Sequence, residues 1–324
     1  MIKATGKTAF LILLLIQVPL YAGTRQADYW LNKMMDAVHQ LNYDGYFVYL
    51  HGDNIESLRT VHTVKQGREF ERLFSLNGEA REIVRDNDSV TRILPNDKAI
   101  STTKRLMNKQ YFSGFFELNP DEIEKNYEVT LHGQGRIADR ITNIISFLPR
   151  DGLRYGYRLH LDDEFALPLQ WEMFDQDNYL VSSIMFTKIS IGSDVTDSGP
   201  LLESDAPGTL RTEQTVSTQS HSPSVLANSR NWKFTQTPAG FTIRHHRRGM
   251  PHHKPRDIEH YLFSDGIASF TVYIELTDKV RLNGPAHLGA LNAFGVFIDG
   301  YQVTAVGEVP AETLTFITEL QKNQ

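Results

Sequence analysis

The sequence predicts an α+β protein of two domains, in which a large, mostly antiparallel sheet comes first and a smaller mixed domain follows. Three observations support this prediction: strand-like alternation through most of the first half, a segment near 192–230 that has few large apolar residues, and a return of alternation after it. The chain has 324 residues, which suits two domains of roughly 100 to 200 residues each. We expect the domains at 23–191 and 231–324, joined by a flexible linker at 192–230.

The first 22 residues have the pattern of a cleaved secretory signal peptide. Two lysines precede the apolar run 9–16, and the small residues Ala22 and Gly23 follow it. This run is too short for a membrane span, which needs about 20 apolar residues. An uncleaved anchor is the alternative. We therefore expect cleavage after Ala22 and a periplasmic protein that is held together by packing, because the chain contains no cysteine.

Charge and motif content exclude several classes of function. The formal net charge of -6 and the pI near 6.1 argue against a nucleic-acid-binding protein. Without cysteine there is no thiol nucleophile, no Cys-ligated zinc and no iron-sulfur cluster. We found no nucleophile elbow, Walker loop, dinucleotide fingerprint or helical His-Glu-x-x-His motif. The acidic run 162–164 could supply the carboxylates of a glycosidase, but its place after a strand favours a solvated turn. We expect no catalytic residues and no cofactor.

The first domain begins with an amphipathic helix at 24–41, where apolar residues recur at helical spacing. Strands of period two follow, with the clearest alternation at 127–131 and 159–162. A short helix is expected at 119–124, where Asn119 can cap and Pro120 suits the first turn. Further strands are expected at 44–51, 57–66, 68–76, 80–86, 89–95, 98–103, 135–149, 168–175 and 179–191, with turns at Gln66-Gly67, Asn77-Gly78, Pro95-Asn96-Asp97, Asp151-Gly152 and Asp177-Asn178.

Residues 46–50 break the alternation, because the expected strand is apolar on both faces there. Either the sheet is covered on both sides, as ordinary core, or one face lines an apolar cavity. The cavity hypothesis involves clustered aromatic side chains, which are Phe47, Tyr49, Phe70, Phe74, Phe112, Phe115 and Phe116.

The second domain is expected to be mixed α+β. Its helix should run from Pro310, with Leu314, Ile317 and Leu320 on one face. Its strands are expected at 232–235, 240–243, 258–263, 268–275, 293–298 and 301–306.

A loop at 244–255 contains four histidines and four Arg or Lys residues. His246 and His252 have a spacing that zinc tolerates, but the segment contains no acid and its positive charge disfavours a divalent cation. Arginine matches phosphate and carboxylate groups, so an anion or head-group site is the second hypothesis. A solvated loop without ligand is the third. The candidate contact residues are Arg244, His245, His246, Arg247, Arg248 and Lys254.

Six stretches, in order along the chain, resemble those of the MucB/RseB family of periplasmic negative regulators of sigma-E-type stress responses. The resemblance runs from the first mature helix to the C-terminal helix and omits the linker and the basic loop. The six stretches are 41–49 (LNYDGYFVY), 55–59 (IESLR), 135–140 (GRIADR), 150–157 (RDGLRYGY), 261–270 (YLFSDGIASF) and 306–310 (VGEVP).

The resemblance implies a first domain similar to LolA and LolB, a curved and unclosed antiparallel barrel that surrounds helices and an apolar cavity. It implies that the second domain contacts the periplasmic segment of a transmembrane anti-sigma factor and shields it from a site-1 protease. Lipopolysaccharide or a similar amphiphile would release the regulator, and the family is compatible with a homodimer. A periplasmic carrier of lipids or lipoproteins is the alternative function, since fold does not settle function. A metal-dependent hydrolase built on the histidines is a third possibility.

Overall fold

A computed structural model describes residues 21–86, 89–94, 99–104, 120–195, 211–214, 232–248 and 258–322. The expected signal peptide lies outside the described residues except for its last two positions. Most of the expected linker also lies outside them, as do Phe112, Phe115, Phe116 and Lys254. None of the helices that the structure describes is long and apolar enough to cross a membrane.

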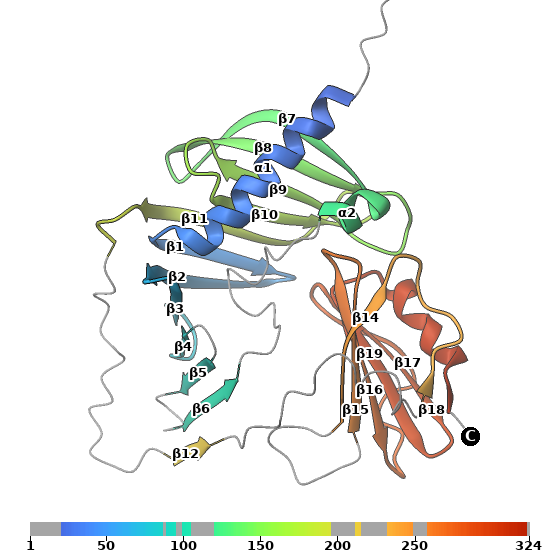
Figure 1. The fold of residues 1–324 in the computed structure, drawn as a ribbon. Helices are drawn as coiled ribbons and strands as arrows, with labels where there is room; N and C mark the ends of the chain where they lie inside the picture. Colours follow the sequence, from blue (N-terminus) through green and yellow to red (C-terminus); the bar gives the residue numbers. More distant parts are fainter. Residues whose placement is uncertain are drawn as a thin grey trace, which may run out of the picture.

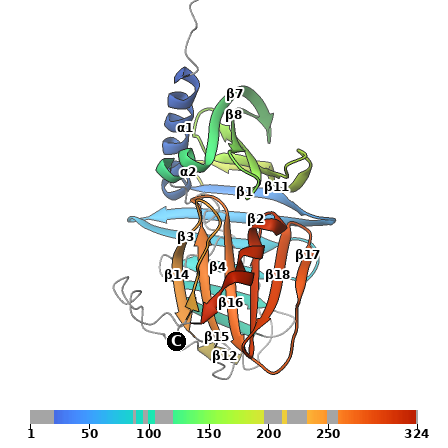
Figure 2. The same cartoon turned by 90° about the vertical axis from the view of Figure 1, so that its right-hand side faces the viewer.

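The first domain is one twelve-stranded sheet with the order β12-β6-β5-β4-β3-β2-β1-β11-β10-β9-β8-β7. Neighbouring strands are antiparallel except for β12 and β6, which are parallel. The sheet curls beside helix α1, and its two edge strands do not pair with each other (Figures 1 and 2). The predicted large, unclosed antiparallel sheet is therefore confirmed.

The expected helices and strands of this domain form close to their predicted bounds, and α1 and α2 are both present. The elements are α1 (Tyr21–Gln40), β1 (Tyr43–His51), β2 (Asn54–Lys65), β3 (Arg68–Ser75), β4 (Glu82–Asp86), β5 (Ser89–Leu94), β6 (Ala99–Lys104), α2 (Pro120–Asn126), β7 (Tyr127–Ile137), β8 (Arg140–Pro149), β9 (Gly156–Asp162), β10 (Pro168–Phe174), β11 (Leu180–Ile191) and β12 (Arg211–Gln214).

Two expectations differ from the structure. The single strand expected at 135–149 is instead the end of β7, a tight turn and β8. The chain reverses at Ala138 and Asp139, whose φ angles of 50° and 64° are unusual for residues with a Cβ atom. No Gly, Pro or Asn marks this turn in the sequence, so the alternation hides it. In addition, β12 pairs with β6 inside the segment that was expected to be a flexible linker.

The core of the first domain lies between α1 and the inner face of the sheet. Ala27, Leu31, Met34 and Val38 recur every three or four residues along α1 and are almost fully buried. They belong to one cluster with apolar side chains of the sheet such as Phe186. Burial of each large side chain contributes about 1.5–3 kcal/mol, so the amphipathic pattern that predicted the helix also fixes which face packs on the sheet.

The second domain is a six-stranded sheet with the order β14-β15-β16-β19-β18-β17, covered on one face by η3. The predicted C-terminal helix is present and buries Leu314 and Ile317 as expected, but it is a 3-10 helix. Strand β17 was not expected from the sequence, because its side chains are mostly exposed and do not alternate. The elements are β13 (Trp232–Lys233), β14 (Thr242–Arg248), β15 (Ile258–Ser264), β16 (Ser269–Leu276), β17 (Gly284–Leu288), β18 (Leu291–Ile298), β19 (Tyr301–Gly307), η3 (Ala311–Glu319) and β20 (Gln321–Lys322).

Candidate functional site at the domain boundary

The two domains meet through turns and strand ends rather than through their sheets. The second domain lies below β1 and β2 and beside α2 in Figures 1 and 2. Ile267 and Ala290, from two turns of the second domain, are 3% exposed and pack into the apolar cluster of the first. The boundary is therefore a packed contact that is continuous with the core of the first domain.

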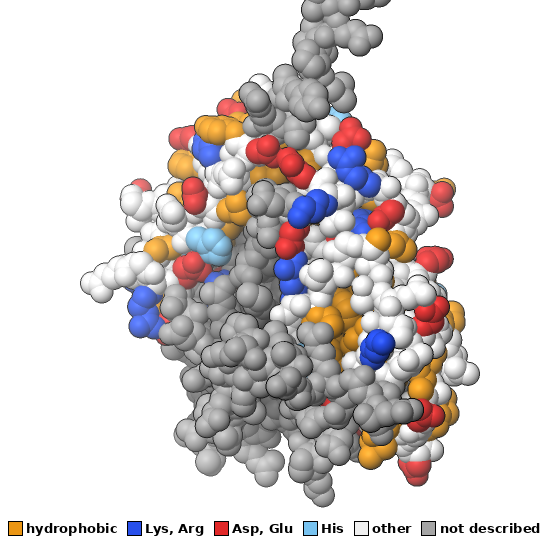
Figure 3. Space-filling model, turned by 45° about the vertical axis from the view of Figure 1, so that its right-hand side comes forward, with side chains coloured by type: hydrophobic (Ala, Val, Ile, Leu, Met, Phe, Trp, Pro, Cys, Tyr) orange, Lys and Arg blue, Asp and Glu red, His pale blue; other side chains and the backbone are white. Residues whose placement is uncertain are grey.

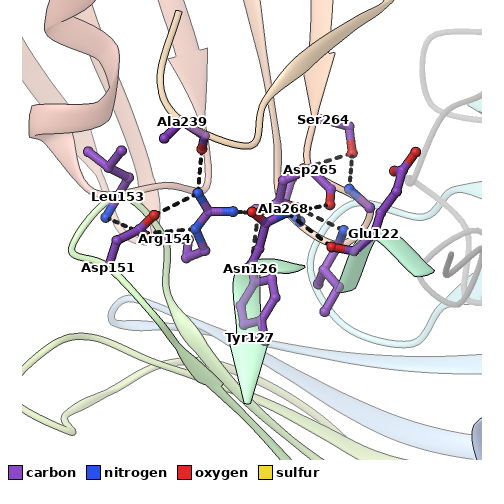
Figure 4. A network of polar contacts seen from close by, with 12 residues as sticks. Glu122, Asn126, Tyr127, Asp151, Leu153, Arg154, Ala239, Ser264, Asp265 and Ala268 are labelled. Carbon is purple, nitrogen blue, oxygen red and sulfur yellow. Dashed lines mark hydrogen bonds and ion pairs between the residues drawn. The ribbon is translucent and has the colours of Figure 1, made fainter. Parts of the chain in front are cut away.

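Arg154 is the central polar residue of this boundary (Figure 4). Its side chain is fully buried, and its Nε and Nη2 atoms each donate to a carboxylate oxygen of Asp151 at 2.9 Å. Its Nη1 atom donates to Asp265 Oδ2 of the second domain at 2.6 Å. Burial lowers the pKa of Arg154, while its hydrogen bonds to the Asp151 carboxylate and the charge of Asp265 outweigh this effect and raise the pKa above its ordinary value.

Asp265 is equally buried and lies in the turn between β15 and β16. Its Oδ1 atom accepts hydrogen bonds from the backbone N–H groups of Ile267 and Ala268, at 2.9 and 2.8 Å. Its Oδ2 atom accepts from Arg154 and also from the hydroxyl of Tyr127 at 3.1 Å. Both carboxylate oxygens therefore have partners, which a buried charge requires. Burial, together with the charges of Tyr157 and Asp265, raises the pKa of Tyr127 well above its ordinary range.

Further hydrogen bonds join the domains around this centre. Thr313 Oγ1 donates to the carbonyl of Leu153 at 2.7 Å, and Asn292 Nδ2 donates to the hydroxyl of Tyr155 at 3.0 Å. Because both acceptors flank Arg154 in the sequence, one short stretch of the first domain carries much of the contact.

A second part of the boundary involves the hairpin between β1 and β2. The hydroxyl of Tyr49 donates to Glu308 of the second domain at 3.5 Å, a long hydrogen bond. Burial and the charge of Glu308 raise the pKa of Tyr49 to about 12. Gly52 meets Gly289 so closely that a Cβ atom on Gly52 would lie 2.7 Å from Gly289 Cα. The two turns approach because neither carries a side chain.

The structure places two of the predicted cavity residues on the inner face of the sheet. Phe47 is 4% exposed and packs edge-on against Phe186 with ring centroids 5.5 Å apart. Tyr49 is half-buried against the same cluster and points towards the second domain. The register pairs Phe47 with Leu58, which is also buried on this face. The inner face at β1 is thus packed apolar core.

Phe70 and Phe74 lie on the opposite face of the sheet. The register pairs Leu58 with Ser75, so the odd-numbered residues of β3 share the inner face and the even-numbered ones do not. On the outer face Arg59 lies 5.8 Å from the ring of Phe74 and donates two hydrogen bonds to Asp44 at 2.9 and 2.8 Å. The described aromatic residues therefore do not line one common surface, because the period of two separates them.

The basic segment is a strand, not a loop, from Arg244 to Arg248, where it forms most of β14. It pairs with β15, and this pairing brings acids that the segment itself lacks. The Nε2 atom of His246 lies 3.0 Å from Glu259 Oε2, and its ring stacks on Tyr261 at 4.2 Å. Arg244 forms an ion pair with Glu122 of the first domain. Two of the candidate anion contacts are therefore already engaged within the chain.

His245 and Arg247 lie with His260 on the other face of this sheet. The register pairs Arg247 with His260, and the rings of His245 and His260 are 6.4 Å apart. Burial and the charge of Arg247 lower the pKa of both histidines, and that of His260 falls to about 4. These histidines are neutral near pH 7, so the positive charge on this face comes from arginine. On the surface drawn in Figure 3, acidic and basic side chains are interspersed.

Sequence reasoning missed Arg154 and Asp265 as site residues. Both stand in stretches that carried the family resemblance, 150–157 and 261–270. The available signal was an Arg and an Asp in two turn-like segments of separate domains. Among the described residues, no group of three His, Asp or Glu side chains is arranged to hold a metal ion.

Comparison with known proteins decides the family. The model of the MucB/RseB N-terminal domain matches residues 26–204, and that of the MucB/RseB C-terminal domain matches residues 227–320. This chain belongs to the MucB/RseB family. The Sigma factor AlgU regulatory protein MucB of Pseudomonas aeruginosa is 28% identical over 320 residues, with 95% of each chain covered. The Sigma-E factor regulatory protein RseB of Escherichia coli K12 is 26% identical over 299 residues, with 89% of this chain and 88% of RseB covered.

Solved structures of MucB share the fold of this MucB/RseB protein. MucB in complex with MucA(peri) has a TM-score of 0.67 at 23% identity, covering 92% of this chain and 99% of MucB. MucB alone has a TM-score of 0.62 at the same identity. The MucB/RseB family consists of regulatory proteins rather than enzymes.

Proposed function

We propose that this MucB/RseB protein is a periplasmic negative regulator that binds the periplasmic segment of a transmembrane anti-sigma factor. Binding shields the segment from site-1 proteolysis, so the sigma factor stays sequestered. Lipopolysaccharide or a similar amphiphile releases the regulator. The observation that carries the proposal is the match to both family domains, in order, and to a sigma factor regulatory protein over 95% of its length.

The tight docking of the second domain supports a regulator over a carrier of lipids. A carrier would need the first domain alone, whereas here both domains contribute fully buried side chains, such as Arg154 and Asp265, to one boundary. A partner segment that contacts both domains would bind with higher affinity when the arrangement of the domains is already fixed, because binding then costs less conformational entropy.

The amphiphile is proposed to act at the inner face of β1. Phe47 is 4% exposed in the described structure, so an acyl chain can reach this face only if packed side chains move. Pockets for such ligands are mostly apolar with few polar groups, and Tyr49 adds one hydroxyl at the end of this face. Since Tyr49 also contacts Glu308, an acyl chain that displaces it removes a contact between the domains. Such a ligand favours an altered arrangement, provided that it binds that arrangement more tightly.

A protease-protection assay tests the proposal directly. Residues 23–324 are mixed with the periplasmic segment of the anti-sigma factor and the site-1 protease, with and without lipopolysaccharide. We expect the protein to slow cleavage and the lipid to restore it. An unrelated substrate of the same protease, treated with lipid alone, controls for direct effects on the protease. If the segment is neither bound nor shielded, the carrier function replaces the regulatory one.

The head group is proposed to contact the basic strand β14. Because Arg244 is paired with Glu122, an anionic head group must compete with that carboxylate. Replacing Arg244, Arg247 and Arg248 together by Ser should weaken lipopolysaccharide binding and reduce its dependence on salt. The matched variant Glu122→Gln should strengthen binding, since it frees Arg244. Unchanged affinity in both variants would exclude the strand as the head-group contact.

A further inference from the structure

The first domain holds Arg154 by contacts of its own, to which the second domain adds the carbonyl of Ala239, which accepts from Nη2 at 2.5 Å. Asp151 lies three residues before it and accepts two hydrogen bonds from the guanidinium group, both at 2.9 Å. The same carboxylate accepts from the backbone N–H of Leu153 at 3.0 Å, which fixes the turn that carries both residues. The guanidinium carbon lies 5.7 Å from the ring centroid of Tyr127, also in the first domain. Arg154 thus has a charged partner and a fixed direction within its own domain.

The second domain holds Asp265 in place in the same way. The two backbone N–H groups that bind its Oδ1 atom, from Ile267 and Ala268, belong to its own turn. This turn requires a φ angle of 107° at Gly266, a conformation that glycine adopts readily. The Oδ2 atom is left to face the first domain, where Arg154 and Tyr127 donate to it (Figure 4). Asp265 is therefore presented as a ligand by a rigid turn.

The separation of these two residues would not leave a buried charge without a partner. Removing one member of a buried ion pair is usually costly because the other charge loses its partner. Here Arg154 would keep Asp151, and Asp265 would keep the N–H groups of its own turn. Each half is complete within its own domain, so the contact can open and close while both domains stay folded.

We propose that Arg154 and Tyr127 form a carboxylate-binding site on the first domain, and that its occupation by Asp265 is a reversible lock that holds the two domains together. The occupant is a residue of this chain, and the site accepts a carboxylate because it offers one guanidinium and one hydroxyl donor. The lock does not depend on the identity of the anti-sigma factor or of the amphiphile.

The surroundings of the lock exclude water and favour one alignment of the domains. The ring of Phe241 lies 5.0 Å from the guanidinium carbon of Arg154. Gly240, with a φ angle of 79°, leaves no room for a side chain, since a Cβ atom there would lie 2.2 Å from Asn126 Oδ1. Asn126 Nδ2 in turn donates to the carbonyl of Asp265 at 3.2 Å. The charge pair is therefore enclosed by groups from both domains, which strengthens it relative to an exposed pair.

A second ion pair between the domains serves as the matched control. Arg244 and Glu122 are also joined across the boundary, but their side chains are 35% and 28% exposed. Exposed pairs of this kind contribute little to stability. The Arg154–Asp265 pair differs because both side chains are buried and each is held in position by its own domain. Neutralising Asp265 should therefore separate the two domains, whereas neutralising Arg244 should not.

The experiment measures the distance between the domains in solution. The chain contains no cysteine, so Lys188→Cys and Lys279→Cys, one exposed site in each domain, accept a donor and an acceptor dye. In this background Asp265→Asn keeps an oxygen for its own turn and places an amide N–H₂ against Arg154. We expect the population with separated domains to rise by about tenfold or more, while Arg244→Gln leaves the wild-type distance.

A small carboxylate then tests the site itself. In Asp265→Ala the site is empty, and added sodium formate should shift the distances back towards those of the wild type, with sodium chloride as the ionic-strength control. Formate should have no such effect on Arg154→Ala. An unchanged distance in Asp265→Asn would overturn the proposal. So would unfolding of the second domain in that variant, detected by circular dichroism, because Asp265 would then be a structural part of its own domain. Tyr127→Phe, which removes one donor, should give a smaller opening.

Discussion

Acidification should destabilise the second domain through His260. This residue alternates with the buried Tyr261 on β15 and therefore faces away from the aromatic core. Its ring lies 5.9 Å from that of Tyr273 on β16, and Arg247 and His245 face it from β14. Burial, followed by the positive charges of these β14 residues, lowers the pKa of His260 from 6.5 to about 4.

The direction and size of the effect follow from this shift. Because the pKa in the folded state lies below that in the unfolded state, the unfolded chain takes up a proton first as the pH falls. The stability due to neutral His260 is complete above pH 6.5 and is lost between pH 6.5 and about 4. One pKa unit corresponds to about 1.4 kcal/mol. After allowance for the partial exposure of the ring, we expect a loss of about 2 kcal/mol.

Urea unfolding followed through Trp232 measures this loss. The chain contains 3 tryptophans, and replacing Trp30 and Trp171 by Phe leaves Trp232, which is 2% exposed in the core of the second domain. The free energy of unfolding is compared at about pH 7.5 and about pH 4.5, with and without His260→Gln. The carboxylates respond to acid in both proteins, so the difference between them isolates His260. An equal loss in the two proteins would refute the reasoning.

Three further substitutions have defined expected outcomes. Phe47→Ala should lower the free energy of unfolding by about 3–5 kcal/mol, since it leaves a cavity at a packed core position. Urea unfolding followed by circular dichroism measures this loss. A loss below about 1 kcal/mol would show that this face of the sheet is loosely packed. Glu82→Gln should cost about 3 kcal/mol in the same assay, because it removes the negative charge from the buried ion pair with Arg72; no change would contradict that pairing. Gly289→Ala should push the β17–β18 turn away from the β1–β2 turn, since a Cβ atom at position 289 would lie 3.3 Å from the backbone N of Gly52. We expect faster amide hydrogen exchange at the β1–β2 turn. Unaltered exchange would count against the contact.

The secondary structure of the first domain was largely predictable because local patterns set it. Alternation in β9 and helical spacing in α1 depend on neighbours two to four residues apart, and tertiary packing agrees with them. The turn at Ala138–Asp139 was not predicted, because Asp139 has no Gly, Pro or Asn beside it and Ala138 is not a turn former. The φ angles of 50° and 64° are imposed by the pairing of β7 with β8. β17 was missed for a related reason, since an exposed edge strand needs no apolar alternation.

The candidate site was predictable only in part. The sequence singled out Tyr49 and Arg244, and the structure places both at the domain boundary through Glu308 and Glu122. It did not indicate that Phe47 and Phe74 face opposite sides of the sheet, although the strand period contains that information once the register is known. A difference of one residue in register would exchange the two faces. Which aromatic residues share a face could therefore be decided only from the pairing of the strands.

The sequence by itself determined the order of most elements, the amphipathic face of α1, the two domains of the MucB/RseB family and the absence of thiol chemistry. These properties follow from composition, local periodicity and short motifs. Only the tertiary structure decided that Arg154 meets Asp265, 111 residues away along the chain, and that His246 meets Glu259 across β14 and β15. The physical reason is that a charged side chain in the sequence carries no record of its partner, whereas in the folded chain burial makes that partner a requirement.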